Sequence, residues 1–157
     1  MSMRELKVEE LSYEAFHSFG EYEDLLTSRE SGFYPDMIRL CNDGRDTSVS
    51  ISRVEGKGRE IVNYEYHTNT CEGILPLDGD IYIYAAPPFW FPQVDKMRVF
   101  RVPKGTFVRL KAGTLHGGQF SVTGEPVNVL ILLPERTYSN DCEFIDLEEK
   151  DRMLITE

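Results

Sequence analysis

Most of this 157-residue chain reads as a series of short β-strands, and this restricts the fold more than any other feature. Residues 48–54 begin by alternating apolar and polar side chains, as a strand buried on one face does. Glycine and proline recur between such segments, at Asp78-Gly79, Pro103-Lys104-Gly105 and Gly124-Glu125-Pro126. Short strands separated by such turns predict a β-sandwich or a β-barrel.

The predicted strands cover residues 48–54, 61–68, 73–76, 80–85, 97–102, 106–110 and 127–133. The proline-rich residues 87–92 cannot continue a hydrogen-bonded ladder and predict an excursion between two strands. Ser12 as a capping residue and Gly20 as a stop predict one short helix between them. The acidic segment 143–157 predicts a second helix at the C-terminus. No linker divides these elements, so we expect a single domain over residues 1–157.

Two of the three histidines lie in segments that carry further polar side chains at strand spacing. In the first segment Glu65 and His67 are two positions apart, so they point to the same face of a strand. Glu72 is an odd number of positions after His67 and would face the opposite way along a straight strand. We therefore expect a hairpin at residues 68–71 that brings Glu72 back towards His67.

Glycines complete both segments. Gly79 follows Glu72 after six residues, and Gly113 precedes His116 where a turn is needed. This order resembles the two-part signature of the cupin β-barrel. The resemblance implies a mainly β protein with a cupin-type double-stranded β-helix (jelly-roll) barrel and short helical segments at its N- and C-terminal ends.

A divalent metal suits the side chains that the two segments would bring together. Imidazole favours Zn, Ni, Fe or Cu, and carboxylate also accepts Mn. We therefore predict a metal site formed by Glu65, His67, Glu72 and His116, holding Mn, Ni, Zn or Fe. The alternative is that both histidines are hydrogen-bonded core residues without a metal.

Two cations are candidates for binding a small anionic substrate. Arg53 shares its parity with Val49 and Ile51, so we expect it on the inward, apolar face of its strand. An unpaired guanidinium is costly there, which favours a role in holding a substrate carboxylate. Lys111, at the end of the predicted strand 106–110, is the second candidate, with a solvated surface charge as the alternative.

Charge and cysteine content limit the partners and the compartment. Seventeen basic and 27 acidic residues give a net charge of −10, which disfavours nucleic acid and anionic membrane surfaces as partners. No stretch approaches the roughly 18 apolar residues of a membrane span. Three cysteines without a CxxC pattern are too few for a disulfide framework and indicate a reducing compartment. We therefore expect a cytoplasmic protein.

Over nearly its whole length the chain also resembles the ureidoglycolate lyases. The likeness rests on ordered fragments: Leu11-Ser12-Tyr13-Glu14-Ala15-Phe16 before Gly20-Glu21, Ser50-Ile51-Ser52-Arg53, Glu65-Tyr66-His67, Pro76-Leu77-Asp78-Gly79, Gly113-x-x-His116, and Glu135-Arg136 before Ser139-Asn140-Asp141-Cys142. The chain departs from them at Glu72, where they usually have Gln, and at Leu115, where they tend to have Trp.

This resemblance implies a homodimeric carbon–nitrogen lyase that splits ureidoglycolate into glyoxylate and urea during allantoin breakdown. It assigns catalytic roles to His67, Glu72 and His116, and substrate binding to Arg53. Two other classes stay open: another metal-dependent cupin enzyme, such as an isomerase or epimerase of a small polar acid or sugar, and a non-catalytic cupin that binds a small ligand. The apolar residues 85–91 are a candidate interface or lid.

Overall fold

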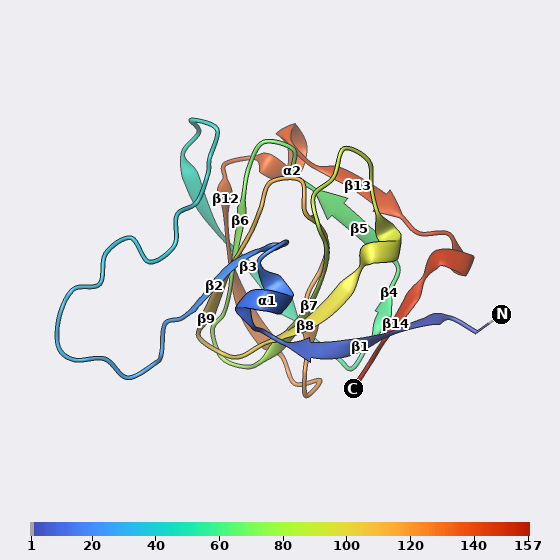
Figure 1. The fold of residues 1–157 in the computed structure, drawn as a ribbon, viewed down its shortest axis with the longest axis horizontal. Helices are drawn as coiled ribbons and strands as arrows, with labels where there is room; N and C mark the ends of the chain where they lie inside the picture. The colour runs from blue at the N-terminus through green and yellow to red at the C-terminus, as the bar shows by residue number, and fades with distance from the viewer. Residues whose placement is uncertain (1) are drawn as a thin grey trace.

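The computed structural model describes residues 2–157, and most of its ordered elements are strands (Figure 1). The strands are β1 (Arg4–Glu10), β2 (Gly20–Asp24), β3 (Thr47–Val54), β4 (Glu60–Ile61), β5 (Asn63–Tyr66), β6 (Glu72–Pro76), β7 (Ile81–Ala86), β8 (Arg98–Val102), β9 (Thr106–Leu110), β10 (Leu115–His116), β11 (Phe120–Ser121), β12 (Val127–Pro134), β13 (Glu143–Asp146) and β14 (Met153–Thr156). The helices are α1 (Tyr13–Phe16) and α2 (Thr137–Asn140), with 3₁₀ turns η1 (Val94–Lys96) and η2 (Glu149–Asp151).

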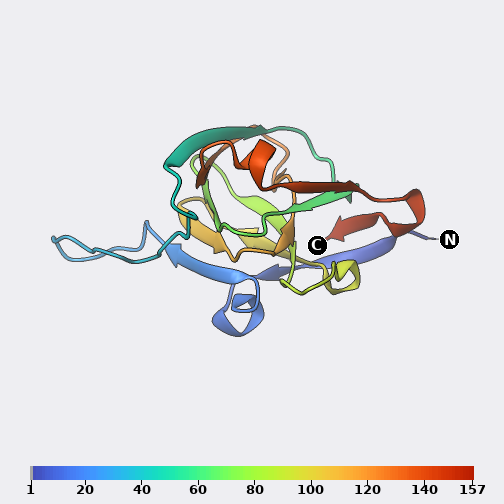
Figure 2. The same cartoon turned by 90° about the horizontal axis from the view of Figure 1, so that it is seen from above.

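These strands form two curved sheets that face each other (Figures 1 and 2). The larger sheet has nine strands in the order β13-β5-β10-β7-β8-β1-β14-β4, with β11 also paired to β7. The smaller sheet has five strands in the order β2-β9-β6-β12-β3. The chain passes from one sheet to the other eight times, between β1 and β2, β3 and β4, β5 and β6, β6 and β7, β8 and β9, β9 and β10, β11 and β12, and β12 and β13. This winding is the cupin-type double-stranded β-helix predicted from the sequence.

The barrel interior is filled by one apolar cluster to which both sheets contribute. Its buried members are Phe16, Phe19, Ile74, Ile81, Ile83, Ala85, Phe100, Val102, Val108, Leu110, Val127, Val129 and Ile131. A second apolar cluster lies on the other face of the larger sheet and packs side chains of its strands together, among them Leu6, Ile61, Tyr64, Met153 and Ile155. Each fully buried large apolar side chain contributes about 1.5–3 kcal/mol relative to its exposed state, so these clusters are the main reason that the sheets close.

The strand predictions between residues 48 and 134 are confirmed to within one or two residues, except that Val62 divides residues 61–68 into β4 and β5. The N-terminal helix is confirmed as α1, with the Ser12 side chain accepting the Ala15 N–H at 3.1 Å. Residues 87–92 form no strand, as their prolines predicted.

The predicted helix over residues 143–157 is wrong, because this segment contains β13 and β14. A strand before α1 was also missed: β1 pairs in parallel with both β14 and β8. In β14, Met153 and Ile155 are buried and the intervening residues only partly so, which is a period of two. This alternation is visible in the sequence. A four-residue strand among acidic residues, however, can be recognised only once the strand that pairs with it is known.

A long segment, residues 25–46, joins β2 to β3 and extends away from the barrel (Figures 1 and 2). It is fastened by a disulfide between Cys41 and Cys71, whose Cα atoms are 5.3 Å apart, while Cys142 remains a thiol. This bond was not anticipated from the three cysteines, whose number and spacing indicated a reducing compartment. Disulfides persist mainly in oxidising compartments, so the cysteine count no longer supports a cytoplasmic location, which stays a prediction. Among residues 2–157 we find no helix with the length and apolar character that a bilayer crossing demands.

Candidate metal centre

Four side chains that the sequence singled out meet inside the barrel. Glu65 comes from β5, His67 follows directly after it, Glu72 begins β6 and His116 ends β10. Glu72 Oε2 lies 2.9 Å from His67 Nε2 and 2.7 Å from His116 Nε2. Glu65 Oε1 lies 3.6 Å from His116 Nε2 and 4.0 Å from His67 Nε2. The predicted convergence is therefore present.

The bend that produces this convergence differs from the predicted hairpin. β5 and β6 belong to different sheets and do not pair, so residues 67–71 carry the chain across the barrel mouth. The Asp141 carboxylate accepts the N–H groups of Thr68 and Asn69 at 2.8 and 2.9 Å. Gly113, at φ +81°, donates its N–H to the His67 carbonyl at 2.6 Å. These contacts hold His67 and tie the first sequence segment to the second.

Hydrogen bonds at the far side of each imidazole fix its tautomer. His67 Nδ1 lies 2.7 Å from the Asp141 carbonyl oxygen, and His116 Nδ1 lies 2.8 Å from that of Thr114. A carbonyl oxygen only accepts, so each Nδ1 carries the proton. In the neutral rings both Nε2 lone pairs then face the Glu72 carboxylate, which is also an acceptor. Acceptors that face one another in this way require a cation between them, either a proton or a metal ion.

The pKa values without a metal show how strongly the cluster attracts positive charge. Burial raises the pKa of Glu72, but the charge and hydrogen bonds of His116 and His67 outweigh it and lower this pKa to about 2. Burial lowers the pKa of His116, but the charge and hydrogen bond of Glu72, with the charge of Glu65, raise it to about 9. The metal-free site therefore keeps a proton on His116 at neutral pH.

The donor set also fits a divalent metal. The ligand atoms of Glu65, His67, Glu72 and His116 all lie within 4.8 Å of one another. Metal–ligand bonds of about 2.0–2.2 Å place neighbouring ligand atoms about 3.0–3.5 Å apart, close to the 2.7–4.0 Å that separates the histidine nitrogens from the carboxylate oxygens here. His67, Glu72 and His116 are buried, whereas the Glu65 side chain is 28% exposed and marks the side nearest solvent.

Asp141 is the residue at this site that sequence reasoning missed. Its carboxylate shapes the bend after His67, and its carbonyl orients the His67 ring. Such outer partners of a metal ligand commonly contribute about 10- to 100-fold to metal affinity. Asp141 was quoted within a fragment of the family resemblance, but nothing in its local sequence indicated that it would contact His67.

We expect Asp141→Ala to weaken divalent metal binding by about 10-fold, because residues 68 and 69 lose the carboxylate that shapes the bend after His67, although the Asp141 carbonyl that faces His67 Nδ1 is kept. Isothermal titration calorimetry with Mn²⁺ or Zn²⁺ measures this. Asp95→Ala is the matched control, since Asp95 is exposed and contacts only Lys96 through its carboxylate. Equal affinities for the two variants would show that Asp141 does not position the site.

The metal affinity should also depend on pH. The pKa of His116 in the metal-free protein is raised above 6.5 to about 9, so the protonated form predominates below that pH and must lose its proton to a metal. Glu72, with its pKa near 2, stays ionised throughout this range. From pH 8 to pH 6 we expect the apparent association constant to fall by up to about 100-fold, one factor of ten per unit for one displaced proton. Titrations in buffers of different ionisation enthalpy count the proton released. An affinity that is constant with pH would contradict this assignment.

The expected inward position of Arg53 is wrong. Val49, Ile51 and Arg53 do share one face of β3, but it is the outer face, and the Arg53 side chain is 54% exposed. Its guanidinium donates to Glu55 at 2.8 Å and to the Asn128 side chain at 3.3 Å. Alternation identifies two faces of a strand without saying which one is inside. Arg53 therefore does not join the cluster.

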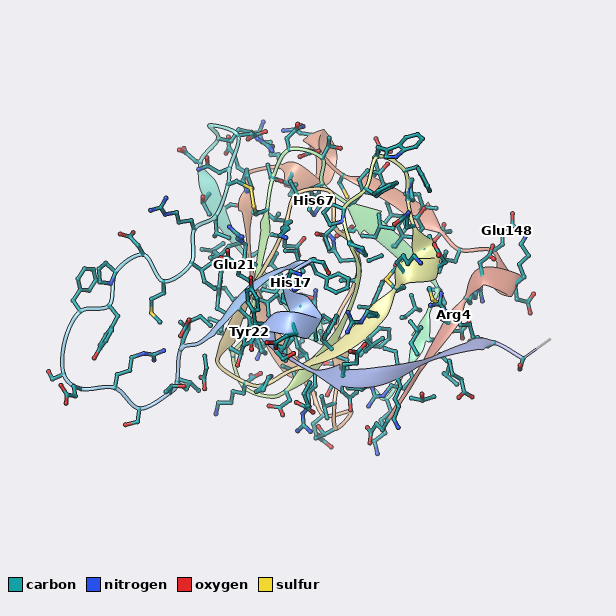
Figure 3. The ribbon with its side chains drawn as sticks, viewed as in Figure 1. Arg4, His17, Glu21, Tyr22, His67 and Glu148 are labelled. Atoms are coloured by element: carbon teal, nitrogen blue, oxygen red, sulfur yellow. A yellow bond between two sulfur atoms is a disulfide. The ribbon has the colours of Figure 1, made fainter. Side chains whose placement is uncertain are left out.

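Lys111 also lies apart from the cluster. Its ammonium donates to the carbonyl of His17 at 2.5 Å, and it lines a cavity of about 650 Å³ beside α1 and β2. His17, Glu21 and Tyr22 line the same cavity, and Figure 3 shows them together, away from His67. Glu21 there is already paired with Arg109 at 3.1 Å. The structure thus brings together the four predicted metal ligands but neither of the two predicted substrate-binding cations.

The fold and this site define a cupin-type β-barrel protein with a candidate metal centre of two histidines and two glutamates. No protein-family model matches the chain, and no curated protein matches it. Solved structures with similarity include the oxalate decarboxylase of Bacillus subtilis, studied for its Mn(II) centres, at 17% identity and TM-score 0.47 over 67% of this chain and 25% of that one. A second oxalate decarboxylase structure matches at 16% identity and TM-score 0.47, over 69% and 27% of the two chains. The chain spans about a quarter of the length of these structures, and the resemblance to ureidoglycolate lyases stays a prediction.

Proposed function

We propose that this protein is a metal-dependent cupin enzyme that acts on a small polar acid. The observation that carries the proposal is the orientation of the two imidazoles, whose Nε2 atoms both face the Glu72 carboxylate while each Nδ1 is held by a backbone carbonyl. This is the arrangement that metal-ligating histidines have in proteins, with the second nitrogen bonded to an outer partner. An ordinary core histidine has no need of a buried carboxylate shared with a second histidine.

The roles that we propose for the four side chains follow from how deeply each is buried. His67, Glu72 and His116 are buried and would hold the ion. Glu65 is the member nearest solvent, and we assign it the proton transfer to and from the substrate. A bound divalent ion would supply Lewis acidity, which lowers the pKa of a substrate hydroxyl and orients its carboxylate. Positioned proton transfer by a group such as Glu65 typically contributes about 100- to 10,000-fold in rate.

Ureidoglycolate is the specific substrate that we put first. One carbon of this molecule carries a hydroxyl, a carboxylate and a ureido nitrogen, so its hydroxyl and carboxylate can chelate an ion. Removal of the hydroxyl proton forms the aldehyde of glyoxylate as the C–N bond breaks, and the departing nitrogen takes a proton to give urea. The family resemblance supports this carbon–nitrogen lyase reaction. Because Arg53 is exposed, it does not hold the substrate carboxylate as expected from the sequence. The bound ion would have to hold that carboxylate instead.

The test is glyoxylate release from ureidoglycolate by purified protein, metal-free and supplied with Mn, Ni, Zn or Fe. We expect release only with metal, and at least about 100-fold slower turnover in Glu65→Gln, with metal bound nearly as before. Glu65→Gln preserves the shape of the side chain and separates proton transfer from ion binding. Normal turnover in Glu65→Gln would overturn its role.

If no metal supports glyoxylate release, we propose that the enzyme catalyses another reaction. A panel of small acids and sugar acids is then the assay. Such an isomerase or epimerase would use the same ion and the same Glu65. If the protein bound a metal and small acids without converting any of them, it would be a ligand-binding cupin. A protein that bound no divalent ion would contradict all of these metal-dependent functions.

A further inference from the structure

One row of side chains crosses the inner surface of the larger sheet and ends at an exposed aromatic ring. Residues directly opposite each other on paired strands point to the same face, and the register aligns Ala85, His116, Glu65 and Phe144 on β7, β10, β5 and β13. Ala85 belongs to the apolar cluster inside the barrel, so all four side chains lie on the inner face. Ala85 and His116 are buried, the Glu65 side chain is 28% exposed and Phe144 is 57% exposed. Exposure thus increases along the row, and solvent reaches Glu65 from the side of Phe144.

The smaller sheet is exposed on the same side of the barrel. β3 and β13 are edge strands of the two sheets and do not pair with each other, and Figure 2 shows both along the upper side of the barrel, β3 in teal and β13 in red. Ser50 and Ser52 of β3 lie opposite Ile131 and Val129 of the inner apolar cluster, so they point inward. Ser50 is nevertheless exposed and Ser52 is half-buried. Inward-facing side chains stay exposed where the opposite sheet does not pack on them, so the barrel interior is open to solvent between β3 and β13.

Two cavities of the molecule do not lead to the metal cluster. One, of about 550 Å³, is lined by Tyr66, Leu115 and Trp90 among others. Tyr66 and Leu115 are next in sequence to Glu65 and His116, so they point to the opposite, outer face of the larger sheet, where they belong to the second apolar cluster. The other is the cavity beside α1 and β2. Neither is lined by any of the four candidate metal ligands, whereas the opening between β3 and β13 ends at Glu65.

The two sides of this opening differ in chemistry. Phe144 presents an apolar ring directly beside Glu65, and Ser50 presents a hydroxyl that can donate and accept. The hydroxyl of Ser48, on the same face of β3, already donates to the Leu133 carbonyl at 3.1 Å. Apolar rings that supply contact area, with a few polar groups that fix orientation, are typical of small-molecule sites. A flat group with hydrogen-bonding edges, such as an amide, is complementary to such a pair of sides.

Charge on β13 indicates that this group is neutral. Glu143 and Asp146, near Phe144 on the same strand, are exposed carboxylates. They would repel a second negative charge on a substrate whose first carboxylate is bound to the ion. A neutral, flat substituent therefore fits this opening better than a second acid group does.

We propose that Phe144 and Ser50 determine substrate specificity, and that the substrate enters between β3 and β13. Its hydroxyl and carboxylate point to the ion and Glu65, and its third substituent is a neutral amide-type group that lies against Phe144 within reach of Ser50. The substrate class is thus a 2-hydroxy acid with a flat, uncharged substituent on the hydroxyl-bearing carbon. This assignment rests on the proposed function, because it takes the ion and Glu65 as the centre of the reaction.

The test is calorimetric titration of Mn²⁺-loaded protein with three acids. Hydroxymalonate monoamide carries a hydroxyl, a carboxylate and a carboxamide on one carbon, and it has a C–C bond where ureidoglycolate has the C–N bond that breaks. Lactate carries a methyl group in place of the carboxamide, and glycolate carries only hydrogen. The wild type should bind the monoamide at least about 10-fold more tightly than glycolate, with lactate between them.

Variants separate the two contacts. Phe144→Ala should weaken binding of the monoamide by about 10-fold and of lactate by less, with glycolate unchanged. Ser50→Ala should weaken only the monoamide, by about 5-fold, because lactate offers no hydrogen bond at that position. Phe144→Tyr keeps the ring and should bind all three acids as the wild type does. Trp90→Ala is the matched control, since Trp90 is an aromatic residue, 86% exposed, that lines the 550 Å³ cavity instead. The Mn²⁺ affinity should be the same in all four variants, because none of these residues belongs to the cluster.

The outcomes distinguish this inference from the proposed function. If the wild type binds glycolate and the monoamide equally, or if Phe144→Ala and Ser50→Ala keep the wild-type preference, the inference is overturned and the proposed function stands. It is also overturned if Phe144→Ala weakens glycolate as much as the monoamide, since that result would mean a disturbed metal site instead of a lost contact with the third substituent. A Mn²⁺-loaded wild type that binds none of the three acids would contradict both.

Discussion

His116→Ala is expected to abolish divalent metal binding in the micromolar range. Loss of an outer partner of a ligand costs about 10- to 100-fold in affinity, and removal of the ligand itself should cost more. His116 Nε2 is the nitrogen nearest to Glu72 Oε2, at 2.7 Å, and the ring is 3% exposed, so no water-accessible group replaces it. Metal content by inductively coupled plasma mass spectrometry, with calorimetric titration, measures the loss. Turnover of ureidoglycolate, if present in the wild type, should disappear with it.

The variant also changes the electrostatics of the cluster. Removing the His116 charge leaves Glu72 buried with one histidine partner, so its pKa should rise from about 2 towards the ordinary value. His17→Ala is the matched control, since His17 is exposed and lies beside α1, outside the four-residue cluster. A His116→Ala protein that binds Mn²⁺ or Zn²⁺ as tightly as His17→Ala does would rule out the metal centre described here.

Reduction of the Cys41–Cys71 disulfide is expected to lower the free energy of unfolding by about 3–4 kcal/mol. The bond links residues 30 positions apart, and the chain-entropy relation for a ring of that size gives this magnitude. Guanidinium denaturation with and without a dithiol reductant measures the difference, and Cys41→Ser should reproduce the reduced state. Because Cys71 immediately precedes Glu72, the metal affinity should fall in the same samples.

Cys142→Ser is the control for reductant effects on other thiols. Cys142 is the free cysteine, and its thiol lies 3.5 Å from Glu65 Oε2, a contact that a serine hydroxyl can also make. Burial and the charge of Glu65 raise the pKa of this thiol to about 12, so it is not a reactive thiolate at neutral pH. Cys142→Ser should keep the full sensitivity of the wild type to reductant. A wild-type denaturation midpoint that reductant does not change would show that the disulfide is absent in solution.

The sequence could predict the four candidate metal ligands because most of the residues that identify them lie close together in the chain. Glu65, His67 and Glu72 lie within eight residues, and the turn glycine Gly113 stands three positions before His116. Asp141 was out of reach of the same reasoning, because its role depends on the distant placement of β13 beside β5. The orientation of the two imidazoles could not be predicted either, since backbone carbonyls rather than side chains determine it.

The same distinction between local and distant information applies to the fold. Alternation and turn residues located β3 to β9 and β12 but not the two-residue strands β10 and β11, and Ser12 located α1. They failed for β1 and β14, whose parallel pairing joins the two ends of the chain. They also placed Arg53 on the wrong face of β3, because alternation shows that a strand has two faces but not which of them is buried. The disulfide between Cys41 and Cys71 could not be predicted either, because two isolated cysteines can be recognised as bonded only when their Cα atoms are known to be close.

The disulfide also changes the covalent topology of the molecule. It closes residues 41–71 into a ring, and that ring contains β3, β4 and β5 together with Glu65 and His67. A protease cut within the ring therefore leaves a single covalent molecule, whereas a cut in residues 25–40 opens the chain outside it. Half of the candidate metal ligands thus stay attached to the rest of the protein after cleavage inside the ring, and fragments separate on a gel only after reduction.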